Sequence, residues 1–505
     1  MPEGFSGLLT TAVFLPLAGA LLIALLVKGD KRVRAVAGII ALAELVLSVV
    51  IFVNYDRDAA GFQMVDRVTD WVGAPSLKID YFLGLDGLSA PLVLLTGILG
   101  FVAIISSFFS VKQRVREYFV WLLVLQTAVM GVFTALDFIM FFLLWELELV
   151  PMFFLISIWG SGRREYSAMK FVIFTFLGSA FMLVGILVLY FSTGTFDMTA
   201  LPESIEGARL LLPAGAVFGL LFAGFAIKLP VWPLHTWLPD AHTDAPTAVS
   251  VMLAGVLLKM GGYGMIRVSA TMFPGVMDDL AWLLATAGVV NILYGAVVTM
   301  RQTDLKRLVA FSSISHMGFV LLGLSAVAGA ASSVGMTGAS LQMFTHGTIT
   351  GLMFLLVGLV YDRAHTRYIP DLGGLASRMP ALAVGFLVAG LASLGLPGTS
   401  GFVAELLIFL GAFPAWSWIT AISATGVVLT AGYILWMIQR TMFGPKLERW
   451  ETLKDPSPWE LVPVAVLVAV ILLVGIYPSI VSDVFRAGVD PIAQAIQNVP
   501  EVALR

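Results

Sequence analysis

The sequence contains no cysteine, and only 12% of its 505 residues are charged. The lack of cysteine excludes disulfides, cysteine-ligated iron–sulfur clusters and thiol chemistry on this chain. The charged share is about half that of an ordinary soluble domain, and the net charge of −3 gives no reason to expect nucleic-acid binding. Metal-ligand spacing is not visible around the histidines, which are His235, His242, His316, His346 and His365. The chain also lacks a dinucleotide-binding fingerprint, because its G-x-G fragments lie inside apolar runs. Redox chemistry is therefore not expected on this chain.

Apolar runs of membrane-spanning length recur from one end of the chain to the other. The sequence is 59% hydrophobic, and a run of about 20 apolar residues crosses a bilayer as a helix. The first run lacks the basic flank and the small-residue cleavage site of a signal peptide, so we expect it to be the first span. The pattern predicts an all-α polytopic membrane protein of fourteen spans, at about 8–27, 33–53, 88–109, 117–134, 136–158, 166–191, 213–236, 246–268, 279–300, 307–327, 337–361, 380–412, 416–442 and 458–478.

The basic residues test this count, because cytoplasmic loops carry an excess of lysine and arginine. With the N-terminus outside, most of the 29 basic residues fall in the connections assigned to the inside, such as Lys28–Arg34, Lys112–Arg116 and Arg301–Arg307. A miscount in the middle of the chain would destroy this alternation. We therefore predict fourteen spans with both termini on the outer side.

A few ionisable side chains lie within the predicted spans, where each costs about 2.5–3.5 kcal/mol on the insertion scale. The candidates among them are Glu146, Glu148, Lys228, Lys259, His316, His346 and Glu405. A buried lysine can lose its proton, which arginine cannot, and histidine titrates near neutral pH. A single Lys–Glu pair is often only a structural tie, and a single histidine is often a packing residue. So many groups spread over six helices favour a proton path over that structural interpretation.

Two predicted spans are interrupted by proline. The first interruption, "KLPVWPLHTWLPD", begins at Lys228, and the second, "GLPGTSG", precedes Glu405. Proline removes a helical donor, so the freed backbone groups need protein or water as partners. The two breaks lie five spans apart. Because five is an odd number, a repeat of five spans lies in the membrane upside down relative to its copy. Paired broken helices in inverted repeats mark ion sites in transporters, whereas unrelated proline kinks would carry no such meaning.

Several long stretches resemble one known family. They are "FFLLWELELVPMFFLI", "KLPVWPLHTWLPDAHTDAPTAVSVMLAGVLLKMGGYG", "DLKRLVAFSSISHMG" and "LPGTSGFVAELLIF". Together they look like the antiporter-like subunits of respiratory complex I, over essentially the whole chain. Within this family, the glutamate at position 405 resembles the M branch, whereas the L and N branches and the sodium/proton antiporter subunits typically carry lysine at this position. The absence of a long lateral helix after residue 478 also argues against the L branch.

The resemblance implies an architecture and a set of roles. It implies helices 1–3 in residues 1–116, a first inverted five-helix repeat in 117–268, a second in 279–443, and a loop with helix 14 in 444–505, with helices 7 and 12 broken. It further implies that Glu146 pairs with Lys228, that Lys259 links the two halves, that His316 and His346 form a relay, and that Glu405 is the terminal group. The family pattern gives Glu148 no role, and its partner stays open.

The resemblance also implies partners and a location. The chain would translocate protons in a bacterial cytoplasmic membrane beside neighbouring antiporter-like chains, driven by electron transfer in partner subunits. No cofactor or metal is expected on this chain, while FMN, iron–sulfur clusters and quinone are expected in the partners. Two alternatives remain, a subunit of a multisubunit sodium/proton antiporter and a membrane scaffold without transport. The electron donor (NADH, ferredoxin or coenzyme F420), the quinone type and the number of protons per turnover stay undetermined.

Overall fold

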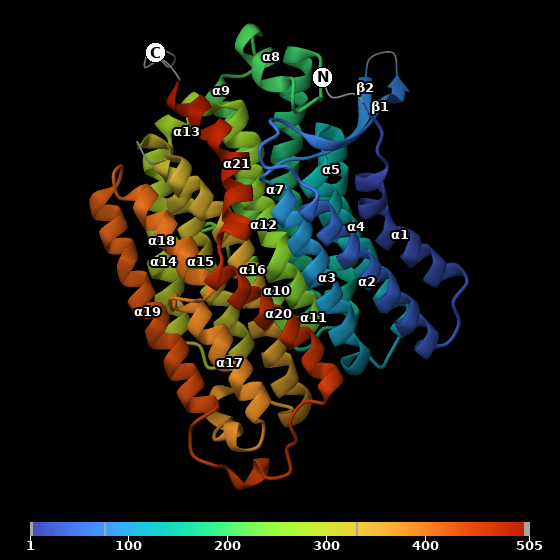
Figure 1. The fold of residues 1–505 in the computed structure, drawn as a ribbon, viewed down its shortest axis with the longest axis vertical. Helices are drawn as coiled ribbons and strands as arrows, with labels where there is room; N and C mark the ends of the chain where they lie inside the picture. The colour runs from blue at the N-terminus through green and yellow to red at the C-terminus, as the bar shows by residue number, and fades with distance from the viewer. Residues whose placement is uncertain (1–3, 75–76, 330–331, 499–505) are drawn as a thin grey trace.

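A computed structural model describes residues 4–74, 77–329 and 332–498 of the chain. The molecule is a bundle of helices along one long axis, with a small hairpin at one end (Figure 1). Within these described ranges, 12 helical segments are long and apolar enough to cross a membrane. They are α1 (Leu8–Leu25), α2 (Asp30–Val53), α3 (Ala90–Ser110), α4 (Val115–Thr134), α5 (Phe138–Leu147) with α6 (Leu149–Trp159), α7 (Arg164–Thr193), the segment Thr247–Ala270, α14 (Ala281–Met300), α15 (Leu305–Leu324) with the turn η3 (Ser325–Ala328), α16 (Ser332–Ala364), α19 (Ser417–Thr441) and α20 (Pro458–Ile476). The predicted helical membrane architecture is confirmed.

Both predicted interruptions are present. The helix α9 (Ala214–Lys228) ends at Lys228, and an irregular turn follows over residues 229–236. The next helix, α10 (Trp237–Asp244), begins directly after 236, where the span was expected to end. The helices α17 (Pro380–Ser393) and α18 (Ser400–Ala412) flank the second break. Each of these four helices is shorter than the others that span, so the count of fourteen remains a prediction.

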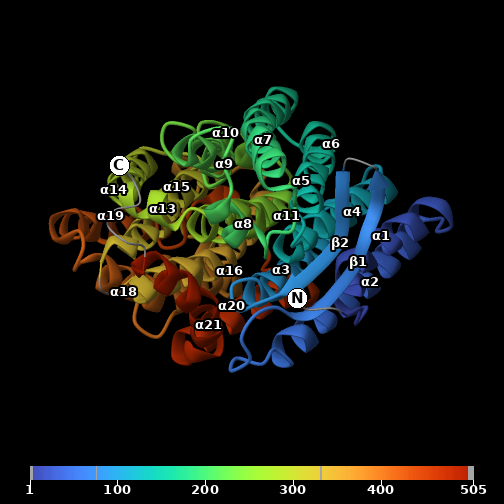
Figure 2. The same cartoon turned by 90° about the horizontal axis from the view of Figure 1, so that it is seen from above.

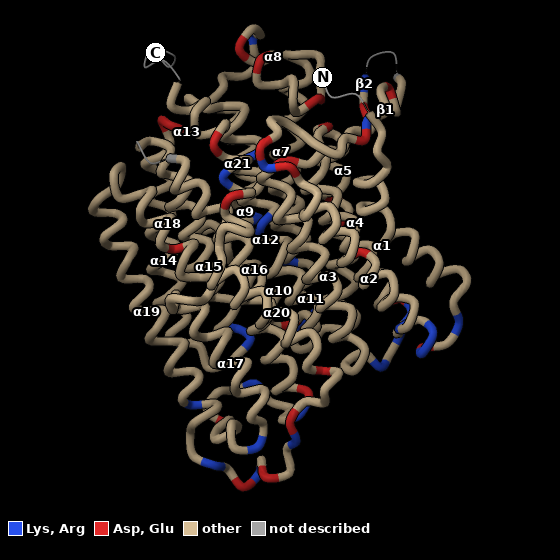
Figure 3. Tube along the Cα trace, viewed as in Figure 1, with Lys and Arg blue, Asp and Glu red and all other residues tan. Residues whose placement is uncertain are grey.

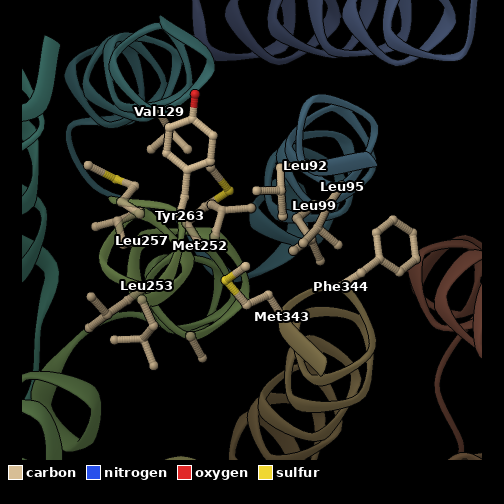
Figure 4. Close-up of a cluster of buried hydrophobic side chains, with 14 of the residues drawn as sticks. Leu92, Leu95, Leu99, Val129, Met252, Leu253, Leu257, Tyr263, Met343 and Phe344 are labelled. Carbon is tan, nitrogen blue, oxygen red and sulfur yellow. The ribbon is translucent and has the colours of Figure 1, made fainter. Parts of the chain in front are cut away.

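The segment after α10 departs from a regular α-helix in two places. It consists of α11 (Thr247–Met252), a π-helical turn η1 (Leu253–Leu257), α12 (Leu258–Gly264) and a second π-helical turn η2 (Met265–Ala270). Every residue of its most apolar window is buried. Figure 4 shows how Met252, Leu253 and Leu257 of this segment lie near Leu92, Leu95 and Leu99 of α3 and Met343 of α16. This segment is therefore the central helix of the molecule.

Glycine allows the closest helix contacts. A Cβ added at Gly295 of α14 would lie 2.5 Å from the backbone nitrogen of Ser315 in α15, and one at Gly288 would lie 2.9 Å from that of Leu322. Small residues let backbones approach in this way in membrane proteins, where the hydrophobic effect does little to drive helices together. The side-by-side packing of α14 and α15 therefore depends on these two positions.

One end of the bundle carries elements that the sequence pattern did not predict. The strands β1 (Gln63–Ala74) and β2 (Leu77–Leu85) form an antiparallel hairpin in the connection expected to be a loop. Arg67 ties this hairpin together, because it contacts Asp80 at 2.7 Å and Asp197, beyond α7, at 3.0 Å. The short helices α8 (Leu201–Gly207) and α13 (Pro274–Asp279) lie at the same end (Figure 1).

A further helix, α21 (Ser479–Gln497), follows the last predicted span. Its buried residues recur every three or four positions from Val481 to Ile496, so one face packs on the bundle beside α16 (Figure 2). The 3-10 turns η4 (Ile369–Asp371), η5 (Leu375–Ser377) and η6 (Glu448–Trp450) lie in connections. Lysines and arginines gather at the end opposite the hairpin (Figure 3), as the alternation of basic loops predicted.

Candidate functional site

A buried ion pair joins α9 to the junction between α5 and α6. The ammonium of Lys228 contacts a carboxylate oxygen of Glu148, and the two side chains are 1% and 0% exposed. The rings of Trp145 and Phe171 lie 5.6 and 5.4 Å from the same ammonium. Aromatic faces attract cations, so the charge of Lys228 is enclosed by one carboxylate and two rings. Lys228 sits where the helix stops, because Pro230 cannot continue the hydrogen-bond pattern.

The predicted pairing of Lys228 with Glu146 is wrong in this structure. Residues two apart on a helix point about 200° apart, so only one of Glu146 and Glu148 can face α9. Glu148 lies at the point where α5 gives way to α6 and faces Lys228. Glu146 is half-buried, lies within hydrogen-bonding reach of Ser179 of α7, and its Oε1 atom has no hydrogen-bond partner among the described residues. The spacing alone predicted that the two glutamates diverge, but not which of them faces the lysine.

Lys259 lies on the central helix between the two π-helical turns. Its Nζ donates to the carbonyl oxygen of Ala254, which belongs to the first of these turns, and lies 2.8 Å from Nδ1 of His346. The π-helical turns are rare and occur often at functional sites. The central helix also touches α9 directly, because a Cβ at Gly261 would lie 2.6 Å from the backbone nitrogen of Leu229. Lys259 is thus placed between the Lys228 pair and the second half of the molecule.

His346, His316 and Glu405 continue this line toward the second interrupted helix. The rings of His316 and His346 are 5.5 Å apart. His316 lies 2.8 Å from the carbonyl oxygen of Ser312 and 3.1 Å from that of Ser393, at the end of α17. Both contacts can be hydrogen bonds at once only when the ring is protonated. All three side chains line one cavity of about 10 Å³, which is about the size that one water molecule needs.

A larger pocket opens at the basic end of the bundle. Its volume is about 400 Å³, and Lys112, Arg164, Lys306, Asp362 and Arg367 are among the residues that line it. Lys306 is buried, and its Nζ donates to the carbonyl oxygen of Ala245. The pocket therefore reaches from the charged connections to the start of the central helix.

His242 lies between this pocket and Lys259. Its ring stacks on Phe354 at 4.6 Å, and neither ring nitrogen has a hydrogen-bond partner in the described part of the chain. It lies close enough to both Lys306 and Lys259 to feel their charges. The sequence analysis named His242 without giving it a role, and it placed Lys306 in a loop. The signal available for His242 was its position between a proline-broken helix and the central span.

The structure therefore brings four of the six predicted site residues into contact with one another or with a shared cavity, and it pairs a fifth, Lys228, with a residue outside the predicted set. Lys228 pairs with Glu148, Lys259 contacts His346, and His346, His316 and Glu405 share a cavity. Glu146 is left beside this line.

Comparisons with known proteins agree with this architecture. The family model described as "NADH:quinone oxidoreductase/Mrp antiporter, TM" matches residues 135–431. The chain is 42% identical to NADH-quinone oxidoreductase subunit M of Rhodobacter capsulatus, over 97% of this chain and 96% of that one. It is also 42% identical to an NAD(P)H-quinone oxidoreductase chain 4 of Thermosynechococcus vestitus, over 98% of this chain and 93% of that one.

Solved structures show the same fold. A chain of respiratory complex I from Thermus thermophilus matches with a TM-score of 0.86 and 29% identity, over 97% of this chain and 98% of that one. A chain of the Mrp complex from Dietzia matches with a TM-score of 0.84 and 21% identity, over 97% and 98%, which shows the fold alone. The match over most of the chain, at 42% identity, shows that this protein belongs to the NADH:quinone oxidoreductase/Mrp antiporter membrane family, in the branch of the subunit M and chain 4 proteins.

Proposed function

We propose that this chain is the proton-translocating M subunit in the membrane arm of a bacterial NADH–quinone oxidoreductase. The observation that carries the proposal is the line of buried ionisable groups from the basic-end pocket through Lys259 and His346 to Glu405. Buried ionisable residues in membrane helices are expensive and mark proton or ion paths. A scaffold would not need titratable side chains along such a line.

The proton route follows the order of these contacts. Protons enter the pocket at the basic end, pass Lys306 and His242, and reach Lys259. The pair of His346 and His316 carries them to Glu405 beside the second helix break. Lysine and histidine can each give up and regain a proton, so each step is a transfer between neighbouring groups or through one water.

Lys228 acts as the switch on this route. Its ammonium is neutralised by Glu148 when the pair is closed. Opening the pair exposes a positive charge to Lys259, and two cations in a low-dielectric interior repel strongly. Glu146 lies on the other face of α5 and also feels the charge of Lys228, so it is an alternative partner during the cycle. Pairing and unpairing of Lys228 would thus move protons away from Lys259.

The same proposal includes the arrangement in the membrane. Fourteen helices would form two inverted repeats, residues 117–268 and 279–443, after helices 1–3 in 1–116 and before a C-terminal part in 444–505. The matched helix breaks after Lys228 and before Glu405 support the repeats. The basic end would face the cytoplasm, with both termini on the outer side of a bacterial cytoplasmic membrane. Neighbouring antiporter-like subunits would flank the chain, and FMN, iron–sulfur clusters and quinone would belong to partner subunits.

Replacement of Lys228 by methionine tests the proposal. We expect the assembled complex in inverted membrane vesicles to lose proton pumping, and quinone reduction to fall about tenfold or more, as for the loss of a proton-transfer group. The exposed Lys31 supplies the matched control, and Lys31→Met should pump normally. Normal pumping by an assembled Lys228→Met complex would refute the proposal. Sodium-dependent exchange without NADH oxidation would instead identify an antiporter subunit.

A further inference from the structure

The N-terminal helices contain a second buried carboxyl group that the proton route does not use. Glu44 lies in the middle of α2 and is 0% exposed, although much of that helix is exposed. Neither of its carboxyl oxygens has a hydrogen-bond partner among the described residues. Gln126 of α4 is 1% exposed, and its amide nitrogen and oxygen lack partners in the same part of the structure. Buried polar atoms are nearly always hydrogen-bonded, to protein or to ordered water, so these four atoms require an explanation.

Helix register places the two side chains at the same depth. The helices α2 and α3 run antiparallel, with Gly38 against Phe108 and Ser48 against Gly97. Glu44, one turn from Ser48, therefore lies beside the turn of α3 that contains Gly100. A Cβ at Gly100 would lie 2.3 Å from the amide nitrogen of Gln126. Glu44 and Gln126 thus flank one glycine-containing turn of α3, from α2 and α4 respectively.

Among the described residues, the helices around Glu44 bring no opposite charge near it. The helices packed against α2 are α1, α3 and α4. Neither α1 nor α3 contains a charged residue, and the only charged residues of α4 are Arg116 and Glu117 in its first turn. The charged residues of α2 other than Glu44 lie in its first turns, from Asp30 to Arg34. An isolated carboxylate in apolar surroundings is very costly, so Glu44 is expected to be the neutral acid.

A layer of leucines separates this pair from the central path. Leu95 and Leu99 project from α3 toward the central helix and α16 (Figure 4). A Cβ at Gly255 would lie 2.3 Å from Leu99, and one at Gly347 would lie 2.9 Å from Leu95. Glu44 and Gln126 therefore lie behind α3 as seen from Lys259 and His346.

We propose that Glu44 and Gln126 form a second proton-holding site, in which the neutral acid and the amide bind a shared buried water molecule between α2, α3 and α4. An acid donates one hydrogen bond and accepts others, and an amide does both, so one water satisfies groups on both helices. Such water is part of the structure and costly to remove. The site goes beyond the proposed function, because no group on the proton route contributes to it.

Infrared spectroscopy of the purified complex tests this site. The wild type should show the carbonyl band of a neutral carboxylic acid at neutral pH, with a shift in heavy water. Glu44→Gln should remove that band, whereas the exposed Glu203→Gln should not. Gln126→Leu should displace the band, because the acid loses its neighbour. Loss of a carboxylate band in Glu44→Gln would show an ionised group and overturn the proposal. A band that Gln126→Leu leaves in place would equally overturn it.

Thermal melting of the same complexes provides a second readout. Glu44→Gln should melt as the wild type does, since it keeps a neutral hydrogen-bonding group of the same size. Gln126→Leu and Glu44→Leu should each lower the midpoint, because each leaves the other polar group buried without a partner. In the variant with both leucines, the melting midpoint should fall by less than the sum of the two single-variant losses. Additive losses would show that the two side chains do not share a site.

Discussion

Replacement of Glu148 by glutamine keeps the size of the side chain and removes the charge that faces Lys228. Both partners are buried, and the ammonium has two aromatic rings as its other close neighbours. Removing one partner of a buried ion pair costs about 3–5 kcal/mol, because the other charge stays buried without compensation. Glu146→Gln is the matched control, because the same change on the other face of the helix leaves the pair of Lys228 and Glu148 intact.

The size of the protein converts this free energy into a melting shift. Unfolding entropy is about 2.1 cal/mol/K per residue near 60 °C. For a chain of 505 residues this amounts to roughly 1 kcal/mol per degree. Glu148→Gln should therefore lower the melting midpoint of this subunit by about 3–5 °C. Glu146→Gln should lower it by about 1 °C or less, as for a change away from a buried pair.

The assay is thermal melting of the purified complex, followed through retention of this subunit. A double variant, Glu148→Gln with Lys228→Met, removes both charges and should regain most of the lost stability, because neutral groups of similar volume often replace a buried pair without cost. Glu146→Gln could instead lower the melting midpoint more than Glu148→Gln does, and Lys228→Met could restore the midpoint only of the Glu146→Gln variant. That result would show that Lys228 pairs with Glu146. The structural assignment of the pair would then be wrong.

Three further predictions follow from other parts of the structure. Asp137 caps α5 directly before the apolar span Phe138–Trp159, and burial raises its pKa to about 6. The folded state therefore keeps a proton that the unfolded chain loses near pH 4, so the free energy of unfolding should fall by up to about 3 kcal/mol between about pH 4 and pH 6. In Asp137→Asn, melting measured against pH should lack this slope. His242→Gln should slow proton-coupled quinone reduction in vesicles about tenfold or more, while the exposed His365→Gln should not, and equal rates would exclude His242 from the route. Gly295→Ala should cost about 1–3 kcal/mol of stability because its Cβ meets the α15 backbone, whereas Gly432→Ala has open space and should melt as the wild type.

Local signals in the sequence were sufficient for the spans and the two breaks. Apolar runs of about 20 residues, with proline after Lys228 and before Glu405, predicted helices and interruptions that the structure contains. The hairpin β1–β2 was missed because its strands are too short for a span. The helix α21 is 19 residues long, but it was missed because its charged residues give it too low a hydropathy for a span. Glu44 was missed although its signal was present, a lone carboxylate in the middle of an apolar run.

The sequence by itself determined that this is a membrane bundle with ionisable groups inside it and a family resemblance that the relatives confirm. Composition and run length are properties of the chain alone, so they can be interpreted before any contact is known. Only the tertiary structure decided that Lys228 meets Glu148, that His242 lies between a pocket and Lys259, and that Gln126 approaches Gly100 of α3. The physical reason is that a contact between helices depends on the rotation and depth of each one, and these are set by the packing of all the helices together.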